Sequence, residues 1–520
     1  MNTLKNSFTI FFYAFRFNDD VDFQEYLSNT DSIWTPSESE PEKNYFFNHV
    51  QDFFSKNKGA GTAALDTSCC VLFELKKHNP NDAQKEKLFL FNQLFTRPIA
   101  MRSGNSGDIN FKIISDAGVL APRLFYHPLT NIGILSYSTA IQNECNTLLN
   151  LEELNYSMRQ FGSFSDSLFH VARNPHPKAE EQENKIASKL TEWQKKDTKV
   201  DVGFHIWKLD TFISLMLQDF PANTYKSLSP RRLQAFVYVQ TEKKMSEEDL
   251  QTASFRLRRI YNSQYSPDKN FLKTTRETYQ SFEQIHAGAS IEGAAIILNE
   301  DYAKLPDFLK QFDTAIRNRF IWTYLLAYFQ RLTLIDINNR LSSLYDSGQP
   351  DKDVLIRALA DLSKIELRSF FEQVSYFTQH NEFYDFITEN LMLSVMLKDV
   401  KEKLQDIHRI LSQQLAEAEK EKEKKKEKKD RILEIMVAAL LIPETLFLFL
   451  STLFEAFDIH FAVKDNKLFN SILFGFCCLI FLLIIPFAVR IYKEYFNVAR
   501  AYFTKKEHDE DVGFKTKFMG

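Results

Sequence analysis

Residues 432–457 read ILEIMVAALLIPETLFLFLSTLFEAF, a stretch that is long and apolar enough to cross a bilayer. A hydrocarbon core of about 30 Å requires roughly 20 apolar residues in a helix. The stretch nevertheless holds Glu444 near its midpoint, directly after Pro443. A carboxylate at that depth costs roughly 2.5 to 3.5 kcal/mol on insertion scales, so we expect Glu444 to face protein or water.

A second apolar stretch, FNSILFGFCCLIFLLIIPFAV, begins at Phe469 and holds no charged residue. The two stretches predict transmembrane helices at 432–456 and 469–491, joined by a short external loop at 457–468. Residues 492–520 would then form a cytoplasmic tail.

Basic residues flank this predicted hairpin on both sides. The run EKEKEKKKEKKDR at 419–431 precedes it, and Arg490, Lys493 and Arg500 follow it. Because loops rich in Lys and Arg stay on the cytoplasmic side, both termini are expected to be cytoplasmic. The sequence therefore predicts a protein of the inner (cytoplasmic) membrane with the bulk of the chain in the cytosol.

The first span carries polar residues on one face. At 100° per residue, Ser451 and Glu455 return to within about 20° of the direction of Glu444. The same face toward the cytosol carries apolar residues, namely Val437, Leu440 and Leu441. Several copies around an axis would place a ring of carboxylates above a hydrophobic constriction, which are the elements of a cation pore. The alternative is a Glu444 that is protonated or bonded between the two spans of one subunit.

Two spans cannot enclose a water path alone, so the pore interpretation requires a homo-oligomer. A second pattern points the same way. From Leu393 to Ala418 the apolar positions alternate by four and three residues, a period of 3.5 that is typical of helices packed on copies or neighbours. No Gly or Pro interrupts the chain between Glu382 and Leu441, so we expect one helix to continue from the cytosol into the first span.

Residues 1–300 are expected to form a cytosolic α/β or α+β domain. Runs rich in aromatic and β-branched residues predict strands, and two segments have helical spacing. The predicted strands are 8–17, 69–77, 132–141, 233–240 and 293–299, and the predicted helices are 150–161 and 247–261. Residues 301–431 are expected to be a long-helix stalk, with helices at 314–345 and 352–378 before the third.

Composition excludes several functions. Charged residues make up 25% of the chain and the net charge is −4, so no basic excess indicates nucleic-acid binding. The five cysteines show no Cys-x-x-Cys spacing, and we expect neither disulfides nor a zinc site. No nucleophile, base and orienting group are grouped in the sequence, so we assign no catalytic residue and expect no enzyme.

Three loops are candidates for ligand binding. In IHAGASIEGAAIIL, small residues next to His286, Ser290 and Glu292 would let a ligand approach the backbone at Gly288 and Gly293, and the alternative is a tight hairpin. The second loop, TRPIAMRSGNSGD, places Arg97 and Arg102 beside a Gly/Ser segment suited to phosphate, or is an ordinary surface loop. Arg231 and Arg232, which follow SLSP, supply further cations.

The Lys/Glu run at 419–431 also allows two interpretations. It is typical of a solvated helix held by pairs four residues apart. The other interpretation is a dedicated role in binding anionic lipid or sensing ions.

The order of these parts resembles the CorA superfamily of pentameric metal-ion transporters. In that family a cytosolic α/β domain and long helices lead into the first of two C-terminal spans. The resemblance implies a pentamer and a divalent cation in the pore. The Gly-Met-Asn signature that should follow the first span is absent, and Glu455-Ala-Phe-Asp stands in its place.

A divergent branch of the superfamily is more similar to this chain. CorA-like membrane effectors associated with type III CRISPR defence also lack the signature and carry an enlarged cytosolic domain. The resemblance implies a nucleotide second messenger made from S-adenosylmethionine and ATP. We therefore expect a ligand-gated membrane pore or effector, with a divalent metal-ion transporter and a membrane-anchored scaffold or enzyme as the alternatives.

Overall fold

A computed structural model describes most of residues 2–346, all of 370–458 and six isolated positions. The gaps before residue 347 are 20, 22, 38–40, 43, 55–68, 78, 104–106, 116–117, 143–145, 161–167, 175, 195–202 and 229–231. The isolated positions are Ile356, Ala360, Ser363, Pro486, Arg490 and Lys493. The chain divides into two units, Met1–Gln413 and Gln414–Gly520, each described separately below.

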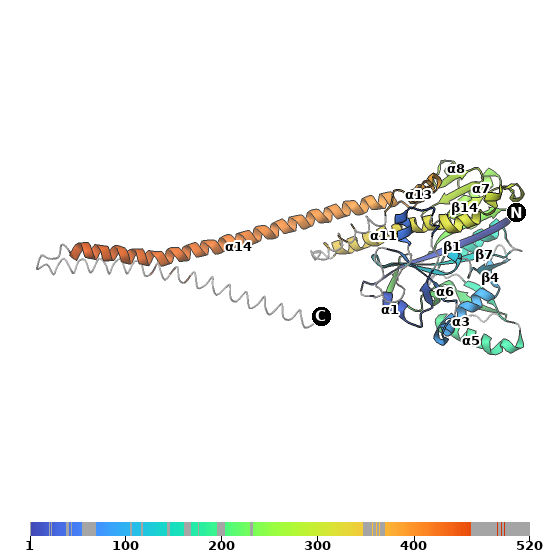
Figure 1. The fold of residues 1–520 in the computed structure, drawn as a ribbon, viewed down its shortest axis with the longest axis horizontal. Coiled ribbons are helices and arrows are strands. Elements are labelled where there is room, and N and C mark those ends of the chain that lie inside the picture. The colour runs from blue at the N-terminus through green and yellow to red at the C-terminus, as the bar shows by residue number, and fades with distance from the viewer. Residues whose placement is uncertain are drawn as a thin grey trace. The chain divides into compact units, whose positions relative to one another are not determined.

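The first unit is built on one large mixed β-sheet whose central strand is β1, Leu4–Phe17 (Figure 1). The strand order is β12-β13-β14-β11-β1-β7-β5-β4-β8-β9, with β2, β3, β6 and β10 attached at the side. The bounds are β2 Trp34–Pro36, β3 Val71–Leu75, β4 Ile99–Ser103, β5 Gly107–Ile113, β6 Arg123–His127, β7 Ile132–Ile141, β8 Leu168–Ala172, β9 Phe204–Lys208, β10 Tyr225–Ser227, β11 Gln234–Thr241, β12 Thr278–Phe282, β13 Ile285–Ala289 and β14 Gly293–Leu298.

Strand β1 is apolar on both faces because the sheet is covered on both sides. It pairs antiparallel with β7 and β11, and β11 pairs in parallel with β14. Phe11 and Phe15 belong to one hydrophobic core, whereas Phe8 and Phe12 belong to the other. A continuous apolar run is what a strand buried on both faces requires.

Helices form a layer on each face of this sheet. The first core receives side chains from α3 Asp82–Thr96, α4 Leu148–Met158, α5 Glu180–Gln194, α6 Leu209–Met216 and α7 Glu247–Arg259. The second receives them from α2 Asn48–Phe53, α9 Asp307–Lys310, α10 Phe312–Ala315, α11 Ile321–Asp346, α13 Thr378–Asn390 and the start of α14 Leu393–Asp458. Two short helices complete the set, α1 Phe23–Ser28 and α8 Lys269–Thr274. The unit is therefore a three-layer α/β domain.

The predicted mixed α/β domain followed by helices is confirmed. All five predicted strands are present as β1, β3, β7, β11 and β14, and the two predicted helices are α4 and α7. The compact unit extends past residue 300, where the sequence analysis ended the domain. Side chains from Leu305 to Ile407 complete the second core, so this part of the predicted 301–431 stalk packs on the sheet.

The long helices differ from the prediction at two places. The helix predicted at 352–378 is not continuous, because residues 370–377 are not helical and Ser375 forms a β-bridge with Phe46; most of 347–369 lies outside the described residues. The helix predicted from Glu382 onward breaks at Met392, whose φ is 59°. That left-handed backbone ends α13, and Leu391 on one side of it and Leu393 on the other are both buried. Burial of two leucines thus overrides helix propensity.

In the first turns of α14, the apolar side chains of the 4-3 pattern pack against other helices of the same subunit. Leu393, Val400 and Ile407 are buried in the second core together with Leu332 and Leu341 of α11. Lys403 Nζ also donates a hydrogen bond to Asn338 Oδ1 of α11. Of the two alternatives, packing on copies or on neighbours, the pattern up to Ile407 is explained by neighbours within the subunit.

The second unit begins inside α14, which continues as one helix to Asp458. In the part of the chain that the structure describes, no helix offers an apolar stretch long enough to span a membrane. Most side chains from 435 to 458, and all residues from 459 to 485, lie outside the described part, as does the tail apart from Lys493. The spans 432–456 and 469–491 and the loop 457–468 therefore stay predictions.

Candidate functional site

A small cavity lies where α11 passes the N-terminal ends of β11 and β14, and three arginines line it. Its volume is about 220 Å³, and its wall includes Arg159, Arg232 and Arg331 together with a single carboxylate, Glu292. We call this cavity the arginine pocket. Because the arginines outnumber the carboxylate, its wall carries an excess of positive charge.

Arg159 is held in place from several sides. It follows the last residue of α4, and its carbonyl oxygen accepts a hydrogen bond from Leu233 N at 2.7 Å. Its Nη1 donates to the carbonyl oxygen of Ile260 at 2.9 Å. Burial lowers the pKa of Arg159, and the charge of Arg232 lowers it further. Its Nε has no hydrogen-bond partner within the described part of the chain.

Ile260 gives the pocket a strained wall. It follows α7 as its C-terminal cap with φ 53°, and its side chain is buried. A β-branched residue in the left-handed region is a genuine outlier, and such residues gather at ligand clamps. The hydrogen bond from Arg159 to the Ile260 carbonyl helps to hold this conformation.

Arg331 reaches the pocket from α11. It stands in the apolar run LLAYFQRLTLID, and its Nη1 donates to the carbonyl oxygen of Ile291 at 3.2 Å. Burial lowers the pKa of Arg331, while Glu292 is among the groups that raise it. Arg232 is exposed at the mouth and forms a β-bridge with Gln160. A half-buried guanidinium such as that of Arg331, without a dedicated carboxylate, favours an anionic ligand.

Three tyrosines continue the pocket wall toward solvent. Arg159 lies over the ring of Tyr156 at 4.3 Å and over that of Tyr261 at 5.6 Å. Tyr261 stacks on Tyr265 with ring centroids 4.6 Å apart, and Tyr265 is 41% exposed. Arg256 Nε donates to the Tyr265 carbonyl oxygen at 2.9 Å and fixes this loop. A planar group of a ligand can therefore stack beside the bound anion.

The predicted hairpin candidate joins this pocket through its turn only. Strands β13 and β14 form a hairpin whose turn holds Ser290 and Glu292, and Ser290 Oγ donates to Glu292 Oε2 and to the Arg258 carbonyl oxygen, both at 2.8 Å. His286 is in β13, and burial lowers its pKa. The tight hairpin that we held as the alternative is therefore present.

The close approach that we expected a ligand to make at the two glycines is made by the protein itself, by helix α7 at Gly288 and most closely by strand β11 at Gly293. A Cβ at Gly288 would lie 2.6 Å from Ser254 Oγ, and one at Gly293 would lie 2.5 Å from the Ala235 carbonyl oxygen and 3.2 Å from that of Arg258. Residues 254 and 258 belong to α7. Glycine is therefore required at Gly288 for packing of α7 on the hairpin, and at Gly293 for the approach of both β11 and the end of α7.

Of the other predicted cations, Arg97 has a described side chain, and it lies away from the arginine pocket. Arg97 Nη1 pairs with Glu183 Oε1 at 2.7 Å, next to β4, which is separated from β11 by β1, β7 and β5. Arg102 is in β4, and its side chain lies outside the described residues, as does all of Arg231. Arg97 therefore serves an internal ion pair rather than the arginine pocket.

The predicted pore-lining positions lie on the backbone of α14. Val437 is 47% exposed. The side chains of Leu440, Leu441, Glu444, Ser451 and Glu455 lie outside the described residues.

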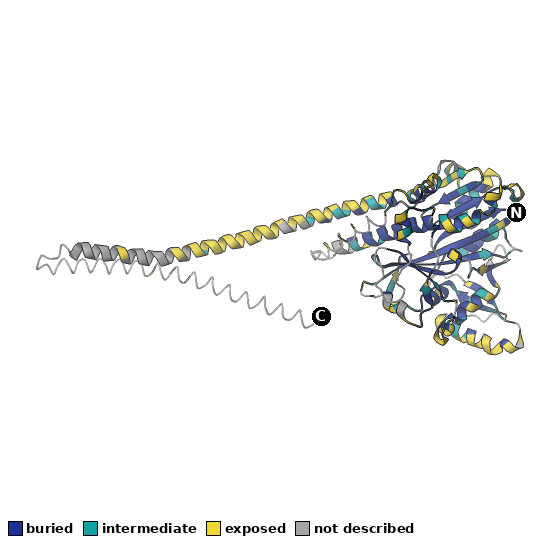
Figure 2. Cartoon of the chain, viewed as in Figure 1, coloured by how far each residue is buried: buried dark blue, intermediate teal, exposed yellow. Residues whose placement is uncertain are grey.

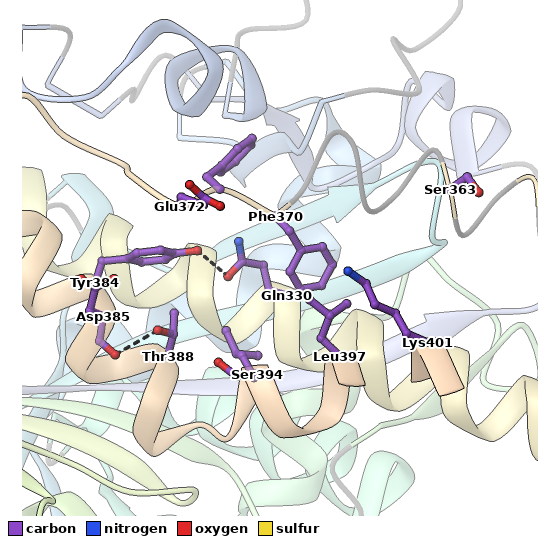
Figure 3. Close-up of a pocket in the computed structure, with 12 residues that line it drawn as sticks. Gln330, Ser363, Phe370, Glu372, Tyr384, Asp385, Thr388, Ser394, Leu397 and Lys401 are labelled. Carbon is purple, nitrogen blue, oxygen red and sulfur yellow. Dashed lines mark hydrogen bonds between the residues drawn. The ribbon is translucent and has the colours of Figure 1, made fainter. Parts of the chain in front are cut away.

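A larger cavity of about 960 Å³ lies between α11, α13, residues 370–372 and the first turns of α14 (Figure 3). In it the Tyr384 hydroxyl donates to Gln330 Oε1 at 2.9 Å, which ties α13 to α11. Its charged groups, Glu372, Asp385 and Lys401, are of both signs. The cavity lacks the excess of positive charge that distinguishes the arginine pocket, but its wall connects α11 to α14.

Comparison with known proteins does not identify the chain: no family model matches it, and no curated protein and no solved structure was found to be similar to it.

Proposed function

We propose that this chain is the subunit of a homo-oligomeric, ligand-gated membrane pore of the CorA-like type. The α/β domain binds an anionic nucleotide messenger in the arginine pocket, and the C-terminal hairpin crosses the inner membrane. The resemblance supports a conjugate of S-adenosylmethionine and AMP as the messenger and a role in antiviral defence with type III CRISPR systems. Pentameric assembly and passage of a divalent cation rest on the same resemblance.

The ligand part of the proposal rests on the chemistry of the arginine pocket. Guanidinium groups bind phosphate through two parallel hydrogen bonds, and a buried wall strengthens them. A volume of about 220 Å³ suits a phosphoryl group and its neighbours rather than a whole dinucleotide. The base would therefore lie outside, on Tyr156 and Tyr265, where stacking contributes roughly 1 to 3 kcal/mol.

The proposal that ligand binding opens the pore is supported mainly by one observation, which is that α14 is continuous. The helix starts buried in the core at Leu393, beside α11, and runs without a break to Asp458 through the predicted first span. Arg331 belongs to α11, which also contacts α13 through Gln330 and α14 through Asn338. An anion that draws Arg331 toward Arg159 would therefore shift α11, and through it the N-terminal turns of α14.

The ligand is tested by calorimetry on the full-length chain in detergent, titrated with ATP, AMP and the conjugate of S-adenosylmethionine and AMP. Arg331→Gln removes one charge-assisted hydrogen-bonding group worth roughly 1.5 to 3 kcal/mol, so affinity should fall about tenfold to a hundredfold. Arg276→Gln is the matched control, because Arg276 is an exposed arginine that pairs with Glu389. If no adenine nucleotide gives a binding heat, the nucleotide-messenger hypothesis is wrong. The remaining alternatives are then a metal-ion transporter and a membrane-anchored scaffold or enzyme.

The pore is tested by ion flux into liposomes that contain the full-length chain. Glu444→Gln keeps the shape and removes one charge per subunit, so flux should fall while assembly persists. Val437→Ser should wet the constriction and make the protein leaky without ligand. Substitutions of Phe481 and Leu482 in the second span should affect stability more than conduction. Unchanged flux in both first-span variants means that the spans only anchor a scaffold or enzyme.

A further inference from the structure

The arginine pocket holds one carboxylate that the binding of a phosphate does not explain. Among the described residues of its wall, Glu292 is the acid that accompanies Arg159, Arg232 and Arg331. It lies in the turn between β13 and β14, next to the exposed Ile291, and is itself partly buried, so it stands at the rim of the pocket. A negative charge at that position repels a bound phosphate. A pocket that bound phosphate alone would bind it better without Glu292.

The neighbouring positive charges do not account for Glu292 either. Arg258, which packs on the hairpin, already pairs with Glu277 Oε2 at 2.9 Å. Glu292 acts on the charge of Arg331 from a distance, but its contacts in the described part of the chain are with Ser290 rather than with a guanidinium. The carboxylate is therefore not the dedicated partner of an arginine.

Glu292 keeps acceptor capacity for a ligand. Its Oε2 lies 2.8 Å from Ser290 Oγ, but the same hydroxyl also donates to the Arg258 carbonyl oxygen at 2.8 Å. A hydroxyl has one proton, whereas an ionised carboxylate can accept about four hydrogen bonds. Its Oε1 accepts no hydrogen bond within the part of the chain that the structure describes. The serine thus holds the carboxylate in place and leaves most of its lone pairs to solvent or to a ligand.

The order of groups along the pocket places a sugar beside this carboxylate. In the proposed function Arg159 and Arg331 bind the phosphate, and the base lies outside on Tyr156 and Tyr265. The ribose of a nucleotide joins these two groups, so it lies at the rim between them. The polar groups that a ribose offers there are hydroxyls, and Glu292 is a charged acceptor at the same rim. Carboxylates bind ribose hydroxyls in this way in dinucleotide-binding folds.

We propose that Glu292 accepts hydrogen bonds from the ribose hydroxyls of the bound messenger, so that the arginine pocket selects a ribonucleotide over a dideoxynucleotide and over free phosphate. The inference rests on the proposed function, because it assigns a specificity-determining residue within the same site. A site that hydrogen-bonds a hydroxyl rejects the analogue that lacks it, since the polar group of the site is then left unpaired. For hydrogen bonds to a charged group the difference in affinity is about tenfold to hundredfold.

Calorimetry on the full-length chain in detergent tests this selection with AMP and with dideoxy-AMP, which lacks both ribose hydroxyls. Wild type should bind AMP about tenfold to hundredfold more tightly than dideoxy-AMP. In Glu292→Ala the two affinities should become equal, and inorganic phosphate should bind more tightly than it does to wild type because the repelling charge is gone. Glu292→Gln keeps the length of the side chain and an acceptor oxygen without the charge, so its preference for AMP should be intermediate.

Glu283→Ala is the matched control for the change in charge. Glu283 lies just before β13, at the end of that strand opposite to the turn that holds Glu292, and its exposed side chain pairs with Lys244 at 3.4 Å. The substitution removes one carboxylate from the same hairpin without touching the pocket. It should keep the wild-type preference for AMP.

Three results would overturn the inference. Equal affinity of wild type for AMP and dideoxy-AMP excludes recognition of the ribose but leaves the arginine pocket as the messenger site. A Glu292→Ala variant that binds both nucleotides more weakly, with the ratio of the two affinities unchanged, assigns Glu292 to support of the turn. Absence of binding by every adenine nucleotide removes the proposed messenger together with this inference.

Discussion

Two parts of helix α14 obey different sequence rules. In residues 393–407 the apolar positions are spaced by four and three, and the side chains of Leu393, Val400 and Ile407 are buried against the same subunit. In residues 419–431 no apolar position occurs, and every side chain is exposed (Figure 2). A regular sequence pattern therefore shows that a helix packs against something, but it does not identify the partner. The partner of the first part is its own domain, whereas the second part is exposed to solvent.

The largest expected difference between the two parts of α14 is in the effect of a leucine-to-alanine substitution on the stability of the domain. Leu393→Ala leaves a cavity in the second core, and the free energy of unfolding should fall by about 2 to 5 kcal/mol. Leu433→Ala removes a side chain that is 61% exposed, so it should change the stability of the domain by less than about 0.5 kcal/mol. Urea unfolding followed by tryptophan fluorescence measures both. Equal losses would mean that the first turns of α14 are not part of the core.

Acid should weaken the domain through His380 of α13. Its ring lies between those of Tyr45 and Phe320, at centroid distances of 4.7 Å each, and burial lowers its pKa to about 4. The unfolded chain takes up a proton near pH 6.5, whereas the folded chain does not until about pH 4. Stability contributed by the neutral ring is therefore lost as pH falls from about 6.5 to about 4, by about 3 kcal/mol at most.

His380→Phe isolates this effect from that of other titrating groups. The difference in unfolding free energy between wild type and variant should shrink or reverse in favour of the variant over that window. A constant difference from pH 7 to pH 4 would show that His380 is accessible to protons in the folded state. The charged run at 419–431 should instead respond to salt, since exposed charges are screened.

The smallest effect is expected at Met392, where α13 ends and α14 begins. Its left-handed backbone costs a non-glycine residue roughly 1 to 2 kcal/mol, and glycine avoids this cost but loses more entropy on folding. Met392→Gly should therefore raise the free energy of unfolding by about 0.5 kcal/mol, and Met392→Ile should lower it by about 1 kcal/mol. Calorimetric melting of the two variants gives the comparison. A stabilising isoleucine would indicate that the two helices are continuous in solution.

Much of the fold could be predicted from local patterns. The runs that became β1, β7, β11 and β14 are bounded by turn residues and rich in β-branched or aromatic side chains. The break at Met392 could not be predicted, because no Gly or Pro marks it and the cause is burial of Leu391 and Leu393 on different sides. The helix against which the apolar positions of α14 pack could not be predicted either. That helix is α11, which lies about sixty residues earlier in the chain.

The candidate site could be predicted only in part. Arg232 and Glu292 were among the candidates, and both line the arginine pocket. Arg159 and Arg331 were missed because each comes from a different layer of the fold. A signal for Arg331 was present, since an arginine inside an apolar helical run must be paired or bind a ligand.

The central position of β1 sets the order in which the domain can fold. Its partners β7 and β11 begin at Ile132 and Gln234, so β1 waits for the later of these two strands through roughly 220 residues of synthesis. At about 5 to 20 residues per second that wait lasts on the order of 10 to 45 s. Until β7 is made FTIFFYAFRF is an apolar strand with two open edges, and until β11 is made it keeps one, which is an aggregation hazard. Chaperone demand should therefore fall sharply once β11 has been made, well before the apolar stretches at the C-terminal end emerge.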